Sequence, residues 1–273
     1  MLAGIYGGKS AFFLLFGVIT AGCLWELAGL LFATPEVHLK TRKWIATTSG
    51  VAAYGWIGWI LLFGPDAPEL PGGLPPSLVL NTIGLMTVAL GLLVCLLFCL
   101  ELWLAATRPF AQIGHYLVGV FYVVLPFILL VSMSCIGNTY HPNRVFGLLW
   151  LVWTNDTLAY LVGSRMGKTK LFERISPKKT WEGTLGGIAG TILMAWGIGQ
   201  FLPDFQPTQW LALGVVVSIF GTIGDLVESM LKRSAGVKDS GRLFPGHGGF
   251  LDRFDAFLFM LPFAWLAVAL AGG

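Results

Sequence analysis

Long stretches without a charged residue constrain this chain more than any other feature of its sequence. Asp, Glu, Lys and Arg are absent from residues 44–65, 70–100, 109–143, 183–203, 205–224 and 256–273. A membrane-spanning helix needs about 20 mostly apolar residues, and most of these stretches reach that length. Only 11% of the residues are charged, against about 25% in an average soluble protein. The composition therefore excludes a soluble domain, a disordered chain, a disulfide scaffold and a nucleic-acid-binding protein.

We predict an all-α integral membrane protein with eight or nine transmembrane helices. Eight spans are expected at residues 10–33, 44–64, 78–106, 113–136, 145–164, 183–202, 209–231 and 255–271. The first span is longer than the apolar core of a signal peptide, which has about 7 to 15 residues. We therefore expect it to remain in the mature chain.

The basic residues predict how the chain is oriented in the membrane. With eight spans, one face receives four loops, at residues 34–43, 107–112, 165–182 and 232–254. These loops hold 15 of the 17 Lys and Arg residues, and only Lys9 and Arg144 lie on the other face. By the positive-inside rule the basic face is cytoplasmic. Both termini are then expected on the outer side.

Eleven of the 17 bases lie in just two of these loops, 165–182 and 232–254. We therefore divide the chain into N-terminal transmembrane helices, residues 1–140, and a C-terminal region, residues 141–273, which carries the functional site in its two basic loops. The concentration of bases in these two loops, taken alone, has another explanation. Positive-inside topology and attraction to anionic lipids, worth about 1 kcal/mol per base, would also concentrate bases there.

Carboxylates inside the C-terminal spans are a sharper indication of a site, because such residues are costly to bury and functional by default. Asp156 lies in the fifth predicted span, and Asp225 and Glu228 share one helix face of the seventh. Asp225 is expected about 9 Å below the basic end of its span. Glu26 and Glu101 lie far in sequence from the basic loops, and we interpret them as helix-packing or interfacial residues.

The last two predicted spans bring further carboxylates together. They are joined by a single loop, so they can pack as a hairpin in which Asp225 faces Asp252, with Asp255 entering the last span. Carboxylates from two helices suit a hard cation such as Mg²⁺, with water and phosphate as the remaining ligands. The alternative is a set of ion pairs between these aspartates and Arg233 or Arg253.

The loop before Asp252 combines glycines with bases. Glycine lets backbone amides approach an anion closely, so the loop favours phosphate binding. The glycines, with the neighbouring Pro245 and His247, are Gly236, Gly241, Gly246, Gly248 and Gly249, and the interleaved bases are Lys232, Arg233, Lys238 and Arg242.

The other basic loop ends at the predicted start of a helix. Ser176 or Thr180 is expected to cap that helix, with Glu182 near its positive end. A helix N-terminus next to Lys178 and Lys179 would bind phosphate well. The alternative is a simple cap beside a tryptophan that anchors the chain at the membrane interface.

The segment from Ser229 to Asp255 reads SMLKRSAGVKDSGRLFPGHGGFLDRFD. It resembles, without a departure, the signature of the phosphatidate cytidylyltransferase family, the CDP-diacylglycerol synthases. A second stretch from Trp153 to Gly183, WTNDTLAYLVGSRMGKTKLFERISPKKTWEG, is also similar to the family. Many members have a small residue before the aspartate, where this chain has Asn155. Residues 1–140 resemble the family only in being hydrophobic spans.

This resemblance implies a Mg²⁺-dependent reaction of CTP with phosphatidic acid that gives CDP-diacylglycerol and pyrophosphate for phospholipid biosynthesis. It also implies a multi-pass protein of the inner membrane with the site facing the cytoplasm, a second cation that is divalent or K⁺, and a homodimer. Metal ligands on this hypothesis are Asp225 and Asp252. The expected catalytic residues are Lys232, Arg233, Lys238, Asp239, His247, Arg253 and Asp255. The expected substrate-binding residues are Asp156, Ser176, Lys178, Lys179, Thr180, Ser229, Gly248 and Gly249.

Two other functions remain as alternatives. A CTP-dependent lipid kinase would move the γ-phosphoryl group to a polyprenol and release CDP, but the intact signature argues against it. An anion or metal transporter would line its path with Asp156, Asp225 and Glu228. That function predicts an inverted repeat with polar residues at matched depths, and the sequence contains neither.

Overall fold

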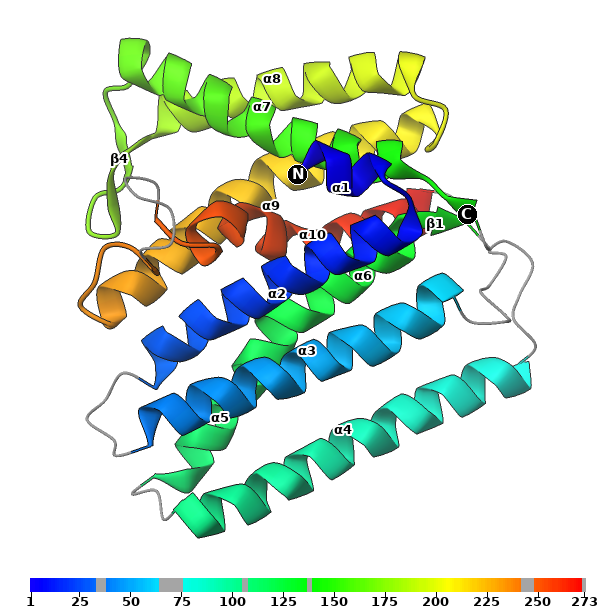
Figure 1. The fold of residues 1–273 in the computed structure, drawn as a ribbon. Coiled ribbons are helices and arrows are strands. Elements are labelled where there is room, and N and C mark those ends of the chain that lie inside the picture. The colour runs from blue at the N-terminus through cyan, green and yellow to red at the C-terminus, as the bar shows by residue number, and fades with distance from the viewer. Residues whose placement is uncertain (33–37, 64–75, 105–107, 137–138, 242–247, 272–273) are drawn as a thin grey trace.

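The computed structural model describes residues 1–32, 38–63, 76–104, 108–136, 139–241 and 248–271, and these are mostly helical (Figure 1). The helices are α1 (Leu2–Tyr6), α2 (Lys9–Leu31), α3 (Leu39–Phe63), α4 (Pro76–Leu104), α5 (Pro109–Gly119), the π-helical turn η1 (Val120–Val124), α6 (Leu125–Met133), α7 (Pro142–Met166), α8 (Trp181–Phe201), α9 (Pro207–Ser234) and α10 (Leu251–Ala271). Two antiparallel hairpins complete the described fold: β1 (Cys135–Ile136) with β2 (Thr139–Tyr140), and β3 (Lys170–Phe172) with β4 (Ser176–Thr180).

Seven helical segments of the described chain are long and apolar enough to cross a membrane. They are Lys9–Leu31, Leu39–Phe63, Pro109–Met133, Pro142–Met166, Trp181–Phe201, Pro207–Ser234 and Leu251–Ala271. The 29-residue helix α4 lies where the third span is predicted. Between its two ends a helix pairs its backbone groups within the segment, as a bilayer requires. The prediction of an all-α membrane protein is confirmed.

The helices pack in pairs that follow the chain. Helix α7 packs on α8, α8 on α9, and α9 on α10, while α2 packs on α3. Figure 1 shows α7 and α8 along one edge of the bundle, α4 along the opposite edge, and α9 and α10 between them. The hairpin expected from the last two spans is therefore present.

Glycines allow the closest of these helix contacts. A Cβ atom added at Gly186 or Gly190 of α8 would overlap side chains of α7. One added at Gly224 of α9 would lie 2.9 Å from the backbone oxygen of Asp255 in α10. Small residues thus let these helices approach within the bundle. Gly197 has open space around its Cβ position.

One basic segment differs from its prediction. Residues 34–43 were expected to form a loop, but α3 already begins at Leu39. Arg42 lies in this helix, is buried, and pairs with Glu101 of α4, with an Nη2–Oε2 distance of 2.8 Å. A buried arginine needs such a carboxylate partner because an unpaired charge is costly there. The packing role expected for Glu101 is confirmed.

The two basic regions with most of the charge lie at the same end of the bundle. In Figure 1 the β3–β4 hairpin and the end of α9 lie at that end. The start of α2 and the end of α10 lie toward the opposite end. This arrangement brings together the segments in which a site is expected.

Candidate active site

A pocket of about 490 Å³ opens between α7, α8, α9 and the β3–β4 hairpin. Five of the site residues expected from the sequence line it: Asp156, Lys178, Lys179, Thr180 and Asp225. The remaining lining residues are Asn155, Ala159, Tyr160, Gly163, Ser164, Lys170, Thr184 and Thr222. Most of the lining therefore comes from the family-like stretch Trp153–Gly183, and α9 adds Thr222 and Asp225.

The hairpin is held against the start of α8 by two side chains. Thr180 caps the helix, because its Oγ1 accepts a hydrogen bond from the Gly183 amide at 3.2 Å. The carboxylate of Glu182 accepts hydrogen bonds from the amides of Lys168 and Thr169, each at 3.1 Å. The expected cap is confirmed for Thr180. Ser176 lies instead in β4, opposite Phe172, and does not line the pocket.

Asn155 joins the three helices behind the pocket. Its Nδ2 donates a hydrogen bond of 3.3 Å to Thr222 of α9. Its Oδ1 would lie 2.8 Å from a Cβ added at Gly187 of α8. That oxygen is buried and has no hydrogen-bond partner among the described residues. A buried acceptor of this kind is unusual, and it lies in the wall of the pocket beside Asp156.

The charges in the pocket favour an anionic ligand. Three lysines, Lys170, Lys178 and Lys179, line it with two carboxylates, Asp156 and Asp225. One ion pair crosses it, because Lys179 Nζ lies 2.5 Å from Asp225 Oδ2. The other two ammonium groups outnumber the remaining carboxylate, that of Asp156, so the lining carries a net positive charge.

A second cluster lies at the end of α9, where one lysine joins two carboxylates. Lys232 Nζ lies 2.7 Å from Asp252 Oδ1 of α10 and also pairs with Glu228, one turn earlier in α9. Asp252 Oδ2 accepts further hydrogen bonds from the amides of Ser240 at 2.9 Å and Gly249 at 2.8 Å. This carboxylate therefore fixes both sides of the loop between α9 and α10.

The carboxylates expected to face each other, Asp225 and Asp252, bind two different lysines. The close approach of α9 and α10 places the backbone of Asp255 next to Gly224, the residue that precedes Asp225 in α9. Ser229 Oγ donates to Asp225 Oδ1 at 3.3 Å. The ion-pair alternative had named two arginines as partners, but the cation on Asp252 is Lys232.

The other expected site residues lie at the surface or against the loop. Arg233 donates to the backbone oxygen of Val237 at 3.2 Å, and the side chains of Lys238, Asp239 and Arg253 are exposed. Gly248 has a φ of 77°, and a Cβ there would lie 2.5 Å from Asp252 Oδ2. His247 lies outside the described residues.

Asp225 and Asp252 carry the kind of oxygen ligand that a magnesium ion prefers. Asp225 and Asp252 each hold a lysine ammonium group, so both positions attract a cation. Within the described ranges, no three His, Cys, Asp or Glu side chains converge as a ready metal cage. Mg²⁺ does not need one, because it commonly binds through one or two carboxylates together with phosphates and water.

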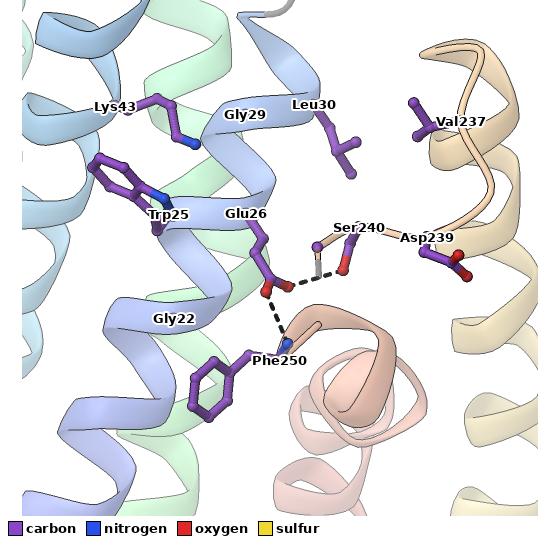
Figure 2. A pocket seen from close by; sticks show the side chains of 11 residues that line it. Gly22, Trp25, Glu26, Gly29, Leu30, Lys43, Val237, Asp239, Ser240 and Phe250 are labelled. Carbon is purple, nitrogen blue, oxygen red and sulfur yellow. Dashed lines mark hydrogen bonds between the residues drawn. The ribbon is translucent and has the colours of Figure 1, made fainter. Parts of the chain in front are cut away.

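Glu26 makes contacts that sequence reasoning missed. We had interpreted it as a packing or interfacial residue, yet its carboxylate binds the loop between α9 and α10 (Figure 2). The available signal was an acidic side chain inside an apolar span, which is functional by default. Its partners are more than 200 residues away, and the sequence does not identify them.

Comparison with known proteins agrees with these features. The model of the Cytidylyltransferase family matches residues 1–271. A phosphatidate cytidylyltransferase from Staphylococcus aureus (strain COL) is 54% identical over 114 residues, which cover 41% of this chain and 44% of that protein. Phosphatidate cytidylyltransferases from Staphylococcus epidermidis (strain ATCC 12228) and Staphylococcus haemolyticus (strain JCSC1435) are both 46% identical. Those matches cover 56% and 49% of this chain, and 58% and 55% of the relatives. The chain thus spans about half the length of the relatives it matches.

Proposed function

This chain belongs to the Cytidylyltransferase family, and we propose that it transfers the cytidylyl group of CTP to phosphatidic acid. The products are CDP-diacylglycerol, a precursor for phospholipid biosynthesis, and pyrophosphate. The observation that carries this proposal is the pocket in which Lys178 and Lys179 meet Asp225 at one end of a membrane bundle. A lysine-rich pocket suits a polyanion, and its place beside apolar helices suits a lipid co-substrate.

In the proposed reaction, a phosphate oxygen of phosphatidic acid attacks the α-phosphorus of CTP. A new P–O bond forms, the bond between the α-phosphorus and the bridging oxygen to the β-phosphorus breaks, and that oxygen leaves with pyrophosphate. Catalysis by this chain consists of positioning and charge stabilisation. Lys178 and Lys179 bind the triphosphate, and Thr180 and Asp156 border the same cavity.

The end of α9, the loop that follows it and the start of α10 supply the second group of charges. Lys232 lies between two carboxylates, so its ammonium group is held in a fixed position from which it can contact a phosphate. Arg233, Lys238 and Arg253 add exposed positive charge around it. We assign these bases to the neutralisation of the phosphatidate headgroup and the leaving pyrophosphate.

Asp225 and Asp252 would hold Mg²⁺. Asp255 lies in the same helix as Asp252, and Asp156 lines the same pocket as Asp225. When bound, the ion supplies positive charge that draws electron density from the phosphoryl oxygens. The chain's own contribution is to hold the two carboxylates on neighbouring helices. Lys179 and Lys232, which now bind them, are the residues that an incoming cation competes with.

We further propose that the site faces the cytoplasm of a bacterial cell from the inner membrane, and that the chain forms a homodimer. The orientation is supported by the bases of the basic loops, since positive loops stay on the cytoplasmic side. CTP is a soluble cytoplasmic nucleotide, which requires the same orientation. The homodimer is supported by the resemblance to the family alone.

Substitution of Asp225 tests this function in purified protein. We expect Asp225→Asn to abolish the pyrophosphate release that depends on both CTP and phosphatidic acid, because the change removes a charge but keeps the side-chain shape. Glu173→Gln is the matched control, since Glu173 is exposed on the β3–β4 turn and outside the pocket. Full activity of a folded Asp225→Asn variant would contradict the proposed site.

A further inference from the structure

The carboxylate of Glu26 reaches from α2 to the loop and the first turn of α10. Oε1 accepts a hydrogen bond from the Phe250 amide at 3.0 Å, and Oε2 accepts one from the Leu251 amide at 2.9 Å. Ser240 Oγ donates to Oε2 at 2.9 Å. The side chain is only 8% exposed, and Figure 2 shows it pointing from α2 toward Ser240 and Phe250.

These contacts make Glu26 a cap for α10. The amides of Phe250 and Leu251 lie at the N-terminus of the helix, where backbone donors have no acceptor within the helix itself. A carboxylate there satisfies the donors and interacts favourably with the positive end of the helix dipole. The N-terminal part of the chain thus supplies the cap for its last helix.

The same hydroxyl that binds Glu26 also binds Asp252. Ser240 Oγ lies 2.8 Å from Asp252 Oδ2 and 2.9 Å from Glu26 Oε2. Because a hydroxyl carries one hydrogen, the two carboxylates share it. Asp252 also follows Leu251 directly in the chain, so Glu26 holds both the residue before Asp252 and the hydroxyl that contacts it.

Glycines make room for this carboxylate. A Cβ atom added at Gly241 or Gly249 would overlap the carboxylate of Glu26, and one added at Gly22 would overlap the ring of Phe250. We had interpreted the glycines of this loop as suited to close approach of an anion. The anion that contacts Gly241 and Gly249 in the structure belongs to the protein itself.

The loop near Glu26 lacks tight packing on one side. A pocket of about 600 Å³ lies between α2, α3 and the loop, and Val237, Asp239 and Ser240 form part of its lining (Figure 2). Side-chain packing therefore does little to fix this segment there. The hydrogen bonds to Glu26, together with the Phe250 ring packed at Gly22, anchor the described part of the loop to α2.

We infer that Glu26 is a positioning residue for the site, which acts through the first turn of α10 and Ser240 to fix Asp252. Asp252 in turn holds Lys232. This role rests on the proposed function, because turnover of CTP with phosphatidic acid is one of its readouts. Residues 1–140 then contribute directly to the geometry of a site built mainly from the C-terminal region.

The test uses Glu26→Gln in the full-length purified protein. Glutamine has an NH₂ group in place of one carboxylate oxygen of Glu26. This group cannot accept a hydrogen bond, so at least one of the present hydrogen bonds is lost. We expect kcat per folded enzyme to fall about tenfold, the factor for one charge-assisted hydrogen bond. KM for CTP should stay within about twofold of wild type, because the lysine pocket is untouched.

Glu101→Gln is the matched control. Glu101 is also a buried carboxylate of the N-terminal helices, but its partner is Arg42. We expect it to lower stability and leave kcat per folded enzyme unchanged. An equal fall in kcat for both variants would reduce Glu26 to a general structural role and overturn the inference.

Ser240→Ala gives an independent variant should Glu26→Gln fail to fold. It removes the shared hydroxyl and leaves both capped amides in place, so we expect a smaller fall in kcat with the same KM. The double variant should lose less than the product of the two single effects, because both changes remove one common hydrogen bond. Independent, multiplicative effects, or wild-type kcat for Ser240→Ala, would contradict the proposed coupling.

Hydrogen exchange separates this inference from the proposed function. In Glu26→Gln, amides of residues 249–253 should exchange about tenfold faster, while those of α4 keep their wild-type rates. Wild-type protection at residues 249–253 would overturn the positioning role whatever the activity. Failure of the wild-type protein to convert phosphatidic acid would instead refute the proposed function, and the exchange result would still decide the role of Glu26.

Discussion

Replacement of Lys232 by methionine tests the cluster at the end of α9 most severely. Lys232 is the cation shared by Glu228, whose side chain is fully buried, and Asp252, which is 10% exposed. Methionine keeps much of the aliphatic stem and removes the charge. Two carboxylates then lose their cation, and breaking a buried pair costs about 3–5 kcal/mol. At about 2–4 °C for each kcal/mol in a chain of this size, Tm should fall by roughly 10 °C.

The assay is thermal unfolding of the detergent-purified protein. Lys238→Met is the control, because Lys238 is exposed on the loop that follows α9 and its replacement should leave Tm unchanged. Adding Glu228→Gln to Lys232→Met should recover part of the loss, since it removes the charge left buried without a partner. The reasoning is refuted if Lys232→Met unfolds within about 2 °C of wild type, or if Lys238→Met destabilises the protein equally.

Three further changes probe other parts of the structure. Thr180→Val removes the cap from the Gly183 amide and should cost about 1 kcal/mol, measured as a lower Tm, so an unchanged Tm would contradict the cap. Gly224→Val places a side chain against the backbone of Asp255 and should destabilise the protein by about 1–3 kcal/mol, whereas a neutral effect would show that α9 and α10 are further apart. Lys238→Cys in a cysteine-free background should react with a membrane-impermeant maleimide only when the cytoplasmic side is accessible, and labelling of intact cells would reverse the proposed orientation.

The membrane helices were predictable because one physical requirement dominates them. An apolar segment without charges has few alternatives to a helix that satisfies its own backbone, so α8, α9 and α10 lie where the charge-free stretches predict. The cap at Thr180 was equally predictable, since it depends on residues three positions apart. Local chemistry was sufficient in both cases.

Features that depend on distant partners were not predictable in this way. Arg42 was assigned to a loop because it is charged, but the partner that allows its burial, Glu101, is 59 residues away. The contact between Glu26 and Ser240 spans 214 residues, and no pattern near either residue indicates it. The β3–β4 hairpin lies in a short polar segment without the alternation that identifies a strand.

The most direct test of the proposed activity follows the label from CTP labelled at the α-phosphorus. Purified protein is incubated with this CTP, phosphatidic acid and Mg²⁺, and the lipid and aqueous products are separated by chromatography, with a parallel reaction lacking Mg²⁺. We predict that label enters the lipid while pyrophosphate is released, and that both are lost without the metal. Label that remains in water as CDP while a prenol is phosphorylated, or no CTP turnover with phosphatidic acid, would contradict cytidylyl transfer.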